Sequence, residues 1–255
     1  YPSLRSKYSD RLDYENDVVK SCIHCHQIGD ARREYYWSRK EPIPDKLLFP
    51  YPHPKSIGMI LDPQKAATLT QVSSNSPAEQ AGLKTGDQIR SMNGQPLVSM
   101  ADVQWVLHNL PSEANAVSLY VDRSGKQLEV ALQLPNNWRS LGDTDWRVSS
   151  WVMCRMALGG MRLDSMTEDE REQAGIQEGM ALKVRSLGRY NAHATARKMG
   201  FREGDILRVY DGQSDFAKEA DLFAYAGKNL KAGNKVVIKF LRQGREKELR
   251  LPIQN

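Results

Sequence analysis

Two thiols and two imidazoles flank one apolar residue in the block Cys22-Ile23-His24-Cys25-His26, which is the sharpest chemical signal in the chain. Thiolate and imidazole are the side chains that bind transition metals, and a thiolate is also a nucleophile. The third cysteine, Cys154, is more than a hundred residues away, so three cysteines cannot build a disulfide framework. The block therefore requires an explanation of its own.

The spacing Cys-x-x-Cys-His resembles the attachment motif of c-type cytochromes, in which two thiols add to the haem vinyl groups and the histidine binds iron. The resemblance implies haem c on Cys22 and Cys25, with His26 as the proximal iron ligand. A helix beginning at Ser9 or Asp10 would carry the motif, because apolar residues recur at helical spacing before it.

Three other interpretations stay open. A thioredoxin-like redox pair needs a strand before Cys22, and no strand pattern precedes it. Zinc could be bound by Cys22, Cys25, His26 and one further residue, although a second Cys/His pair at the usual spacing is missing. The thiols could also form a plain disulfide or remain free.

A haem iron would need a sixth ligand or an open position. His24 lies between the attachment cysteines and cannot reach the opposite haem face, whereas His53 and Met59 follow the proline-rich run. We expect His53 to be the distal ligand, because Met59 is expected to line a pocket elsewhere; an open site or a ligand from a partner remain alternatives.

An internal repeat organises the rest of the chain. Residues 82–95 align without gaps on residues 200–213, and an amphipathic helix follows each copy, at Met100–Asn109 and at 218–230. Each copy then closes with a β-hairpin, predicted from alternating strands around a glycine turn. The predicted hairpin strands are 117–122 with 128–134, and 235–241 with 247–253.

The stretch Ser76-Pro77-Ala78-Glu79-Gln80-Ala81-Gly82-Leu83-Lys84-Thr85-Gly86-Asp87-Gln88-Ile89, closing on Asn93-Gly94, resembles the centre of bacterial PDZ domains. The resemblance implies a groove in which a peptide C-terminus adds as a strand, with its carboxylate held by a glycine-containing loop. The peptide-binding residues that it implies in the two copies are Ile57, Gly58, Met59, Val103, Val106 and Leu107, and Gly159, Gly160, Met161, Leu222 and Phe223. Alternatively, either copy could pack against its own chain and bind no free peptide.

The second copy carries an extra segment in which Thr167 can cap a helix and Glu170 completes a capping box. This helix resembles the one in PDZ domains of high-temperature-requirement serine proteases. The chain has no Gly-x-Ser-x-Gly stretch, and none of its five histidines lies in a recognisable catalytic setting, so no catalytic residue is assigned and enzyme activity stays undecided. The whole order also resembles thioredoxin-like/PDZ proteins with an upstream redox domain.

Length and composition agree with this organisation. The 255 residues, 40% apolar and 26% charged, predict a globular chain that is mainly β with short helices (α+β). We expect a helical segment with the motif at 1–51, PDZ-like β-sandwich or barrel domains at 52–135 and 157–255, and a tryptophan-rich joint at 136–156. In that joint, the tryptophans are expected to pack the domains together and Cys154 to be a buried, inert thiol.

The expected function is that of an exported haem-c electron-transfer protein whose PDZ domains bind the C-terminus of a partner or substrate, with a redox partner besides. The alternative is an adaptor in which the Cys/His cluster is a zinc or disulfide staple. Covalent haem is attached outside the cytoplasm, which predicts a periplasmic location, and any export signal must lie outside a segment that begins at Tyr1. A net charge of +5 with interleaved signs predicts no nucleic-acid binding, and no apolar run is long enough to span a membrane.

Overall fold

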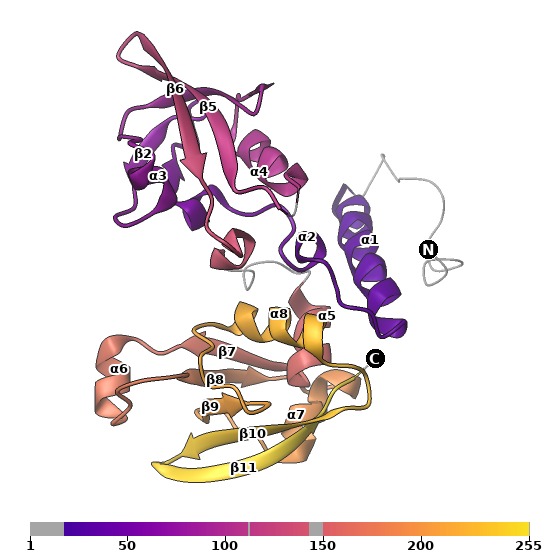
Figure 1. The fold of residues 1–255 in the computed structure, drawn as a ribbon. Coiled ribbons are helices and arrows are strands. Elements are labelled where there is room, and N and C mark those ends of the chain that lie inside the picture. Colours follow the sequence, from indigo (N-terminus) through magenta and orange to yellow (C-terminus); the bar gives the residue numbers. More distant parts are fainter. Residues whose placement is uncertain (1–17, 112, 143–149, 255) are drawn as a thin grey trace. The chain divides into compact units, whose positions relative to one another are not determined.

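The computed structural model describes residues 18–111, 113–142 and 150–254, with the side chains of 18–27 and 150 left out. The chain divides into two compact units (Figure 1). One unit, here the first domain, is Phe49–Asp143, and the other combines Tyr1–Leu48 with Thr144–Asn255. The strands and helices from residue 150 onward are here called the second domain.

The first domain is built from two antiparallel sheets and short helices. The sheets are β1-β2 and β4-β3-β5-β6, in spatial order, and an isolated bridge between Thr68 and Gln88 links the second strand to the third. Its elements are η2 (Pro54–Ile57), β1 (Met59–Leu61), β2 (Leu69–Val72), α3 (Pro77–Gln80), β3 (Gln88–Met92), β4 (Gln95–Pro96), α4 (Met100–Asn109), β5 (Ala116–Arg123), β6 (Lys126–Gln133) and η3 (Trp138–Leu141).

The second domain has one antiparallel sheet in the order β11-β10-β9-β8-β7. Its order of elements repeats that of the first domain, with β7 in the place of β1 and α8 in the place of α4. Its elements are α5 (Ser150–Leu158), β7 (Met161–Ser165), α6 (Glu168–Gln173), β8 (Leu182–Leu187), η4 (Asn191–Ala194), α7 (Thr195–Met199), β9 (Ile206–Tyr210), α8 (Glu219–Asn229), β10 (Lys235–Arg242) and β11 (Arg245–Pro252).

A buried ion pair recurs at matching positions of the two domains. The Arg123 guanidinium donates to both carboxylate oxygens of Asp87 at 2.7 Å and to the carbonyl of Gly82 at 2.8 Å. Arg242 makes the same bonds, also at 2.7 Å, to Asp205 in the second domain. The fork of an arginine fits a carboxylate bidentately, so each pair ties the turn before the third strand to the closing hairpin.

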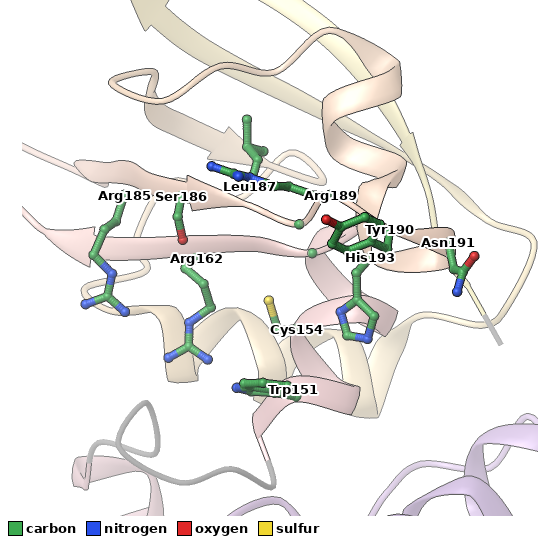
Figure 2. A pocket seen from close by; sticks show the side chains of 12 residues that line it. Trp151, Cys154, Arg162, Arg185, Ser186, Leu187, Arg189, Tyr190, Asn191 and His193 are labelled. Carbon is green, nitrogen blue, oxygen red and sulfur yellow. The ribbon is translucent and has the colours of Figure 1, made fainter.

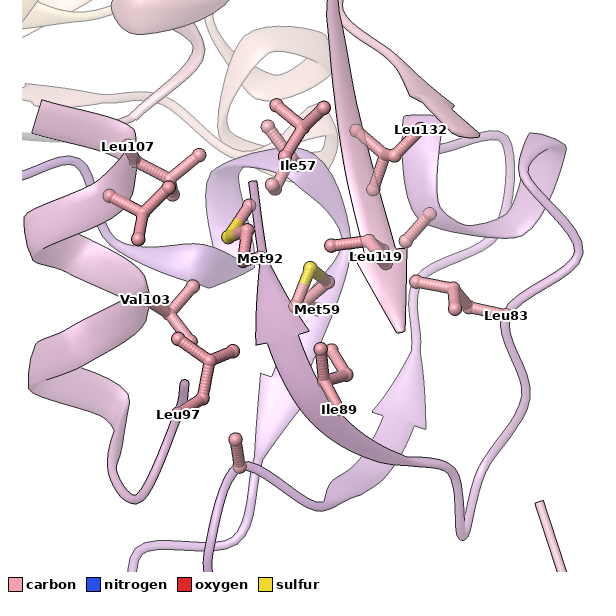
Figure 3. Close-up of a cluster of buried hydrophobic side chains, with 14 of the residues drawn as sticks. Ile57, Met59, Leu83, Ile89, Met92, Leu97, Val103, Leu107, Leu119 and Leu132 are labelled. Atoms are coloured by element: carbon pink, nitrogen blue, oxygen red, sulfur yellow. The ribbon is translucent and has the colours of Figure 1, made fainter. Parts of the chain in front are cut away.

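A single apolar cluster fills the first domain (Figure 3). Ile57, Met59 and Ile89 come from one side of the cluster and Val103 and Leu107 from α4, and all five are fully buried. The amphipathic spacing predicted for α4 therefore places its apolar face on the sheet.

The N-terminal helices α1 (Val18–Ser38) and α2 (Asp45–Leu48) belong to the same unit as the second domain. The indole N–H of Trp37 donates to the carbonyl of Gln254 at 2.8 Å, and the N–H of Ile43 donates to the carbonyl of Gly227 on α8 at 2.9 Å. A Cβ on Gly227 would lie 2.8 Å from the Leu48 side chain, so glycine permits this close approach. The sequence did not indicate that the helices pack on the second domain.

The mainly β fold with short helices is confirmed, and so are the predicted helices and hairpins of both copies. Thr167 and Glu170 form the predicted capping box. The joint at 136–156 differs from the expectation, because it contains η3 and the nine-residue helix α5. Trp138 is buried in the first domain but Trp151 is 63% exposed, so Trp151 does not pack as predicted, and Trp146 lies outside the described residues. No helix among the described residues is long and apolar enough to cross a membrane.

Candidate functional site: two strand edges

The turn before β1 requires glycine. Gly58 has φ 89°, and a Cβ there would lie 2.0 Å from the Ser76 hydroxyl oxygen. His53 caps the preceding turn, with its Nδ1 accepting a hydrogen bond from the N–H of Lys55 at 3.2 Å. The glycine predicted for a carboxylate-binding loop therefore sits where the backbone must turn sharply into β1.

The edge of β1 that faces away from β2 is available to another strand. The carbonyl of Gly58 accepts from Ser73 and the N–H of Asp62 donates to Thr68, so these residues point toward β2. Because successive residues of a strand point to opposite edges, the N–H and C=O groups of Met59 and Leu61 point to the other edge. No strand among the described residues pairs with that edge.

The matching edge of β7 is closed by side chains of the same domain. The carbonyl of Gly160 accepts from Gly188 on the β8 side, which directs Met161 and Leu163 to the free edge. There the Leu163 N–H donates to a Glu219 carboxylate oxygen at 2.8 Å, and the Cys154 thiol donates to the Met161 carbonyl at 2.7 Å. Both side chains are buried, so a peptide strand would have to displace them.

Helix α5 supplies one of these two groups and packs beside both β7 and α8 (Figure 1). Its last turn also accepts the N–H of Gly159 on Arg155 and the N–H of Gly160 on Cys154. The second glycine loop is thus bonded to the helix that precedes it. Burial, together with the charge of Glu219, raises the pKa of Cys154 to about 12, although Arg162 acts in the opposite direction, so this thiol is protonated and inert, as predicted.

In the first domain, the chain before the glycine turn lies on α4. The Tyr51 ring stacks on His108 with the ring centroids 4.1 Å apart, and its N–H donates to His108 Nδ1 at 3.3 Å. The amide of Gln104 donates to the Tyr51 carbonyl at 3.3 Å. Tyr51 therefore borders the groove on its helix side and is itself 45% exposed.

The predicted peptide-binding side chains lie in the two cores rather than on the surface. The side chains that are at most 5% exposed are Ile57, Met59, Val103, Val106, Leu107, Met161, Leu222 and Phe223, and the predicted glycines Gly58, Gly159 and Gly160 all have positive φ. Each set belongs to its own domain, beside the corresponding strand edge. Sequence reasoning missed the residues that close the second edge, Glu219 and Arg162 among them.

The cysteine and histidine cluster lies on a helix, as expected, because α1 includes Cys22, Cys25 and His26. Their side chains lie outside the described residues, so haem or zinc as a cofactor and His53 as a distal ligand stay predictions. Among the described side chains, no group of three or more His, Cys, Asp or Glu residues could hold a metal ion.

Comparison with known proteins identifies the first domain. Residues 55–134 match the family model of the PDZ domain. The chain is 28% identical over 188 residues to a probable periplasmic serine endoprotease DegP-like of Pseudomonas savastanoi, covering 72% of this chain and 37% of that protein. It is 28% identical over 149 residues to the periplasmic serine endoprotease DegP of Salmonella typhimurium, covering 58% of this chain and 27% of that protein. The chain thus spans about a third of the first relative's length.

Solved structures of similar proteins come from the same group. One is an HtrA-type protease AlgW with tripeptide, at a TM-score of 0.37 and 15% identity, covering 78% of this chain and 67% of that one. Another is the HtrA3 PDZ domain bound to a phage-derived ligand, at a TM-score of 0.26 and 24% identity, covering 30% of this chain and 81% of that one.

These relatives correct the function expected from the sequence. The prediction of a haem-c electron-transfer protein with a redox partner is wrong, because the curated relatives are serine endoproteases. The similarity to PDZ-containing proteases and the periplasmic location are confirmed, since the relatives are periplasmic. PDZ domains bind peptide C-termini, so that class of partner is retained.

Proposed function

We propose that the first domain binds the C-terminus of an extended polypeptide along β1, as the recognition part of a periplasmic protein related to the serine endoproteases. The observation that carries the proposal is the contrast between the two strand edges. Met59 and Leu61 present their backbone groups to an open edge, whereas Glu219 and Cys154 occupy the equivalent groups of β7.

The chemistry of the open edge suits a peptide strand. An added strand would exchange backbone hydrogen bonds with Met59 and Leu61, which supplies affinity without regard to sequence. The Met59 N–H lies next to the glycine turn and would donate to the terminal carboxylate. Ile57 and Leu107, both fully buried, form the apolar floor against which the terminal side chain would pack. We therefore expect a preference for an apolar last residue.

Amide chemical shifts of the full chain test the proposal. A peptide with an apolar last residue and a free carboxylate should shift the amides of Met59, Ile60 and Leu61, and leave those of Met161 and Leu163 in place. The same peptide with an amidated end should bind about tenfold more weakly, because it loses a charged hydrogen bond. Shifts on β7 instead of β1, or equal binding of both peptides, would contradict the proposal.

A substitution in the groove gives a matched control. Met100 occupies the position of Glu219, as the caps show: Asp102 accepts from Ser99 as Asp221 accepts from Lys218, two residues after each position. Met100→Glu should place a carboxylate against the Leu61 N–H and abolish peptide binding. Met100→Leu should bind normally, and a Met100→Glu protein that binds equally well would count against the groove.

A further inference from the structure

A pocket of roughly 550 Å³ lies on the second domain, outside the groove just described (Figure 2). It is formed by helix α5, the ends of β7 and β8, and the loop that follows β8. The lining residues with a charged, aromatic or hydrogen-bonding side chain are Trp151, Arg162, Arg185, Ser186, Arg189, Tyr190, Asn191 and His193. This volume is in the range of pockets that bind a ligand of several residues or rings.

The lining of the pocket is positively charged. It includes three arginines and no carboxylate. Arg185 pairs with Asp164 at 3.1 Å, on a carboxylate that is about half exposed, and Arg162 lies 3.6 Å from Glu219. Arg189 is exposed and forms no ion pair or side-chain hydrogen bond with any residue that the structure describes. The pocket therefore has cationic capacity that its own carboxylates do not use.

Two aromatic side chains flank these arginines. Tyr190 is 77% exposed and Trp151 is 63% exposed, which is unusual for residues of their size. Burial, together with the charge of Arg155, lowers the pKa of His193, so its imidazole is neutral at neutral pH and adds a hydrogen-bonding group. Exposed aromatic faces beside guanidinium groups suit a ligand that is both anionic and partly apolar.

The spacing of the arginines indicates an extended ligand. Arg162 pairs in the sheet with Ser186, next to Arg185, whereas Arg189 lies four residues further along the chain. At about 3.3 Å per extended residue, Arg185 and Arg189 are separated by roughly 13 Å of chain. A single small anion would contact one end only. An extended peptide with a carboxylate on every second residue repeats at about 6.6 Å, which places successive carboxylates along this distance.

We propose that this pocket binds an acidic segment in the interior of a polypeptide, separately from any chain terminus bound by the first domain. Carboxylates of the segment pair with Arg185 and Arg189, and its aromatic or apolar side chains stack on Trp151 and Tyr190. The site would give the second domain a binding role although the edge of β7 is closed.

The probe is acetyl-Glu-Tyr-Glu-Tyr-Glu-amide, whose blocked end removes the carboxylate that the first domain would recognise. Titrated into the full chain, it should shift the amides of Arg189 and Tyr190 and leave those of Met59 and Leu61 unchanged. Affinity should fall as salt is raised, because exposed charges are screened. The matched peptide with glutamine in place of each glutamate should bind at least about tenfold more weakly.

Substitutions locate the site. Arg185→Gln with Arg189→Gln should weaken binding of the probe at least about tenfold, since two charged contacts are lost. Arg245→Gln, on the exposed hairpin of the same domain, should leave the affinity unchanged. Equal binding of the glutamine peptide, or an unchanged affinity in the double variant, would overturn the proposal. So would an acidic polysaccharide or inorganic phosphate that binds as tightly as the probe, because the ligand would then not be a polypeptide.

Discussion

Glu219 accepts a hydrogen bond from the backbone N–H of Leu163 at 2.8 Å, and this contact joins α8 directly to the outer edge of β7. In the first domain the same position is Met100, whose thioether cannot replace a carboxylate as a strong acceptor. Two domains with the same order of elements therefore differ at the one edge where a peptide would be added. The difference rests on a single side chain type, reinforced by the Cys154 thiol.

Replacing Glu219 by alanine should destabilise the second unit. The carboxylate is 3% exposed, so Glu219→Ala leaves the buried N–H of Leu163 and the Arg162 guanidinium without this partner. An unsatisfied buried group costs about 1–3 kcal/mol. Thermal or urea unfolding measures the loss. Glu172→Ala on the exposed surface of α6 is the control and should change stability by less than about 0.5 kcal/mol; equal losses in both variants would contradict a structural role for Glu219.

Truncating Arg123 should destabilise the first domain strongly. Asp87 has a side chain that is fully buried, and Arg123→Ala would leave its carboxylate without the bidentate partner. Breaking a buried pair from one side costs about 3–5 kcal/mol. Arg90→Ala removes a more exposed pair with Asp122 and should cost about 1 kcal/mol or less. Urea unfolding monitored on the first domain decides between them, and similar costs for the two variants would show that burial of Asp87 is unimportant.

The same pair makes the first domain sensitive to acid. Burial alone would raise the pKa of Asp87, but hydrogen bonds from Arg123 and from the Lys84 backbone, with the charge of Arg123, lower it below its usual 3.8. A group whose pKa is lowered in the folded state contributes stability above the pKa of the unfolded chain, and that stability is lost as pH falls through the folded pKa. We expect unfolding free energy to fall below about pH 4, and to fall less steeply in Asp87→Asn.

Local signals in the sequence predict the elements of the fold well. The Ser76 cap before α3, and the spacing of Val103 and Leu107 on α4, each act within a few residues and are found as expected. Helix α5 was not predicted, because Met153, Cys154, Met156, Ala157 and Leu158 are all buried and leave no polar face to reveal a period.

The closed edge of β7 was missed for a different reason. Its contacts join residues 56 positions apart, Leu163 and Glu219, and no local pattern encodes them. The pocket beside it was equally hidden, since Arg185 and Trp151 come together only when α5 packs on the sheet. The Cys-x-x-Cys-His block was over-interpreted for function, because a five-residue match carried more weight than the relatives of the other two hundred residues support.

Alanine at Gly58 should cost more than alanine at Gly86. Both glycines have φ near 90°, but a Cβ at Gly86 meets nothing within 4 Å, whereas at Gly58 it would lie 2.0 Å from the Ser76 hydroxyl oxygen. Gly86→Ala should therefore cost only the backbone strain, about 1–2 kcal/mol, and Gly58→Ala more. Combining Gly58→Ala with Ser76→Gly should return the loss to that of Gly86→Ala, since glycine is a tolerable N-cap. Chemical denaturation of the variants measures each cost, and no recovery in the double variant would contradict the steric explanation.

The buried thiol of Cys154 should report opening of α5. In a Cys22→Ser, Cys25→Ser background it is the chain's one cysteine, and its pKa of about 12, raised first by burial and then by Glu219, leaves almost no thiolate at pH 8. A thiol reagent should therefore label the native protein slowly, at the rate at which α5 separates from β7, and label it at once in denaturant. Adding Glu219→Ala should accelerate native labelling, because the hydrogen bond that holds α8 to β7 is lost. Labelling of the native protein as fast as an unfolded peptide would show that Cys154 is not held against the Met161 carbonyl.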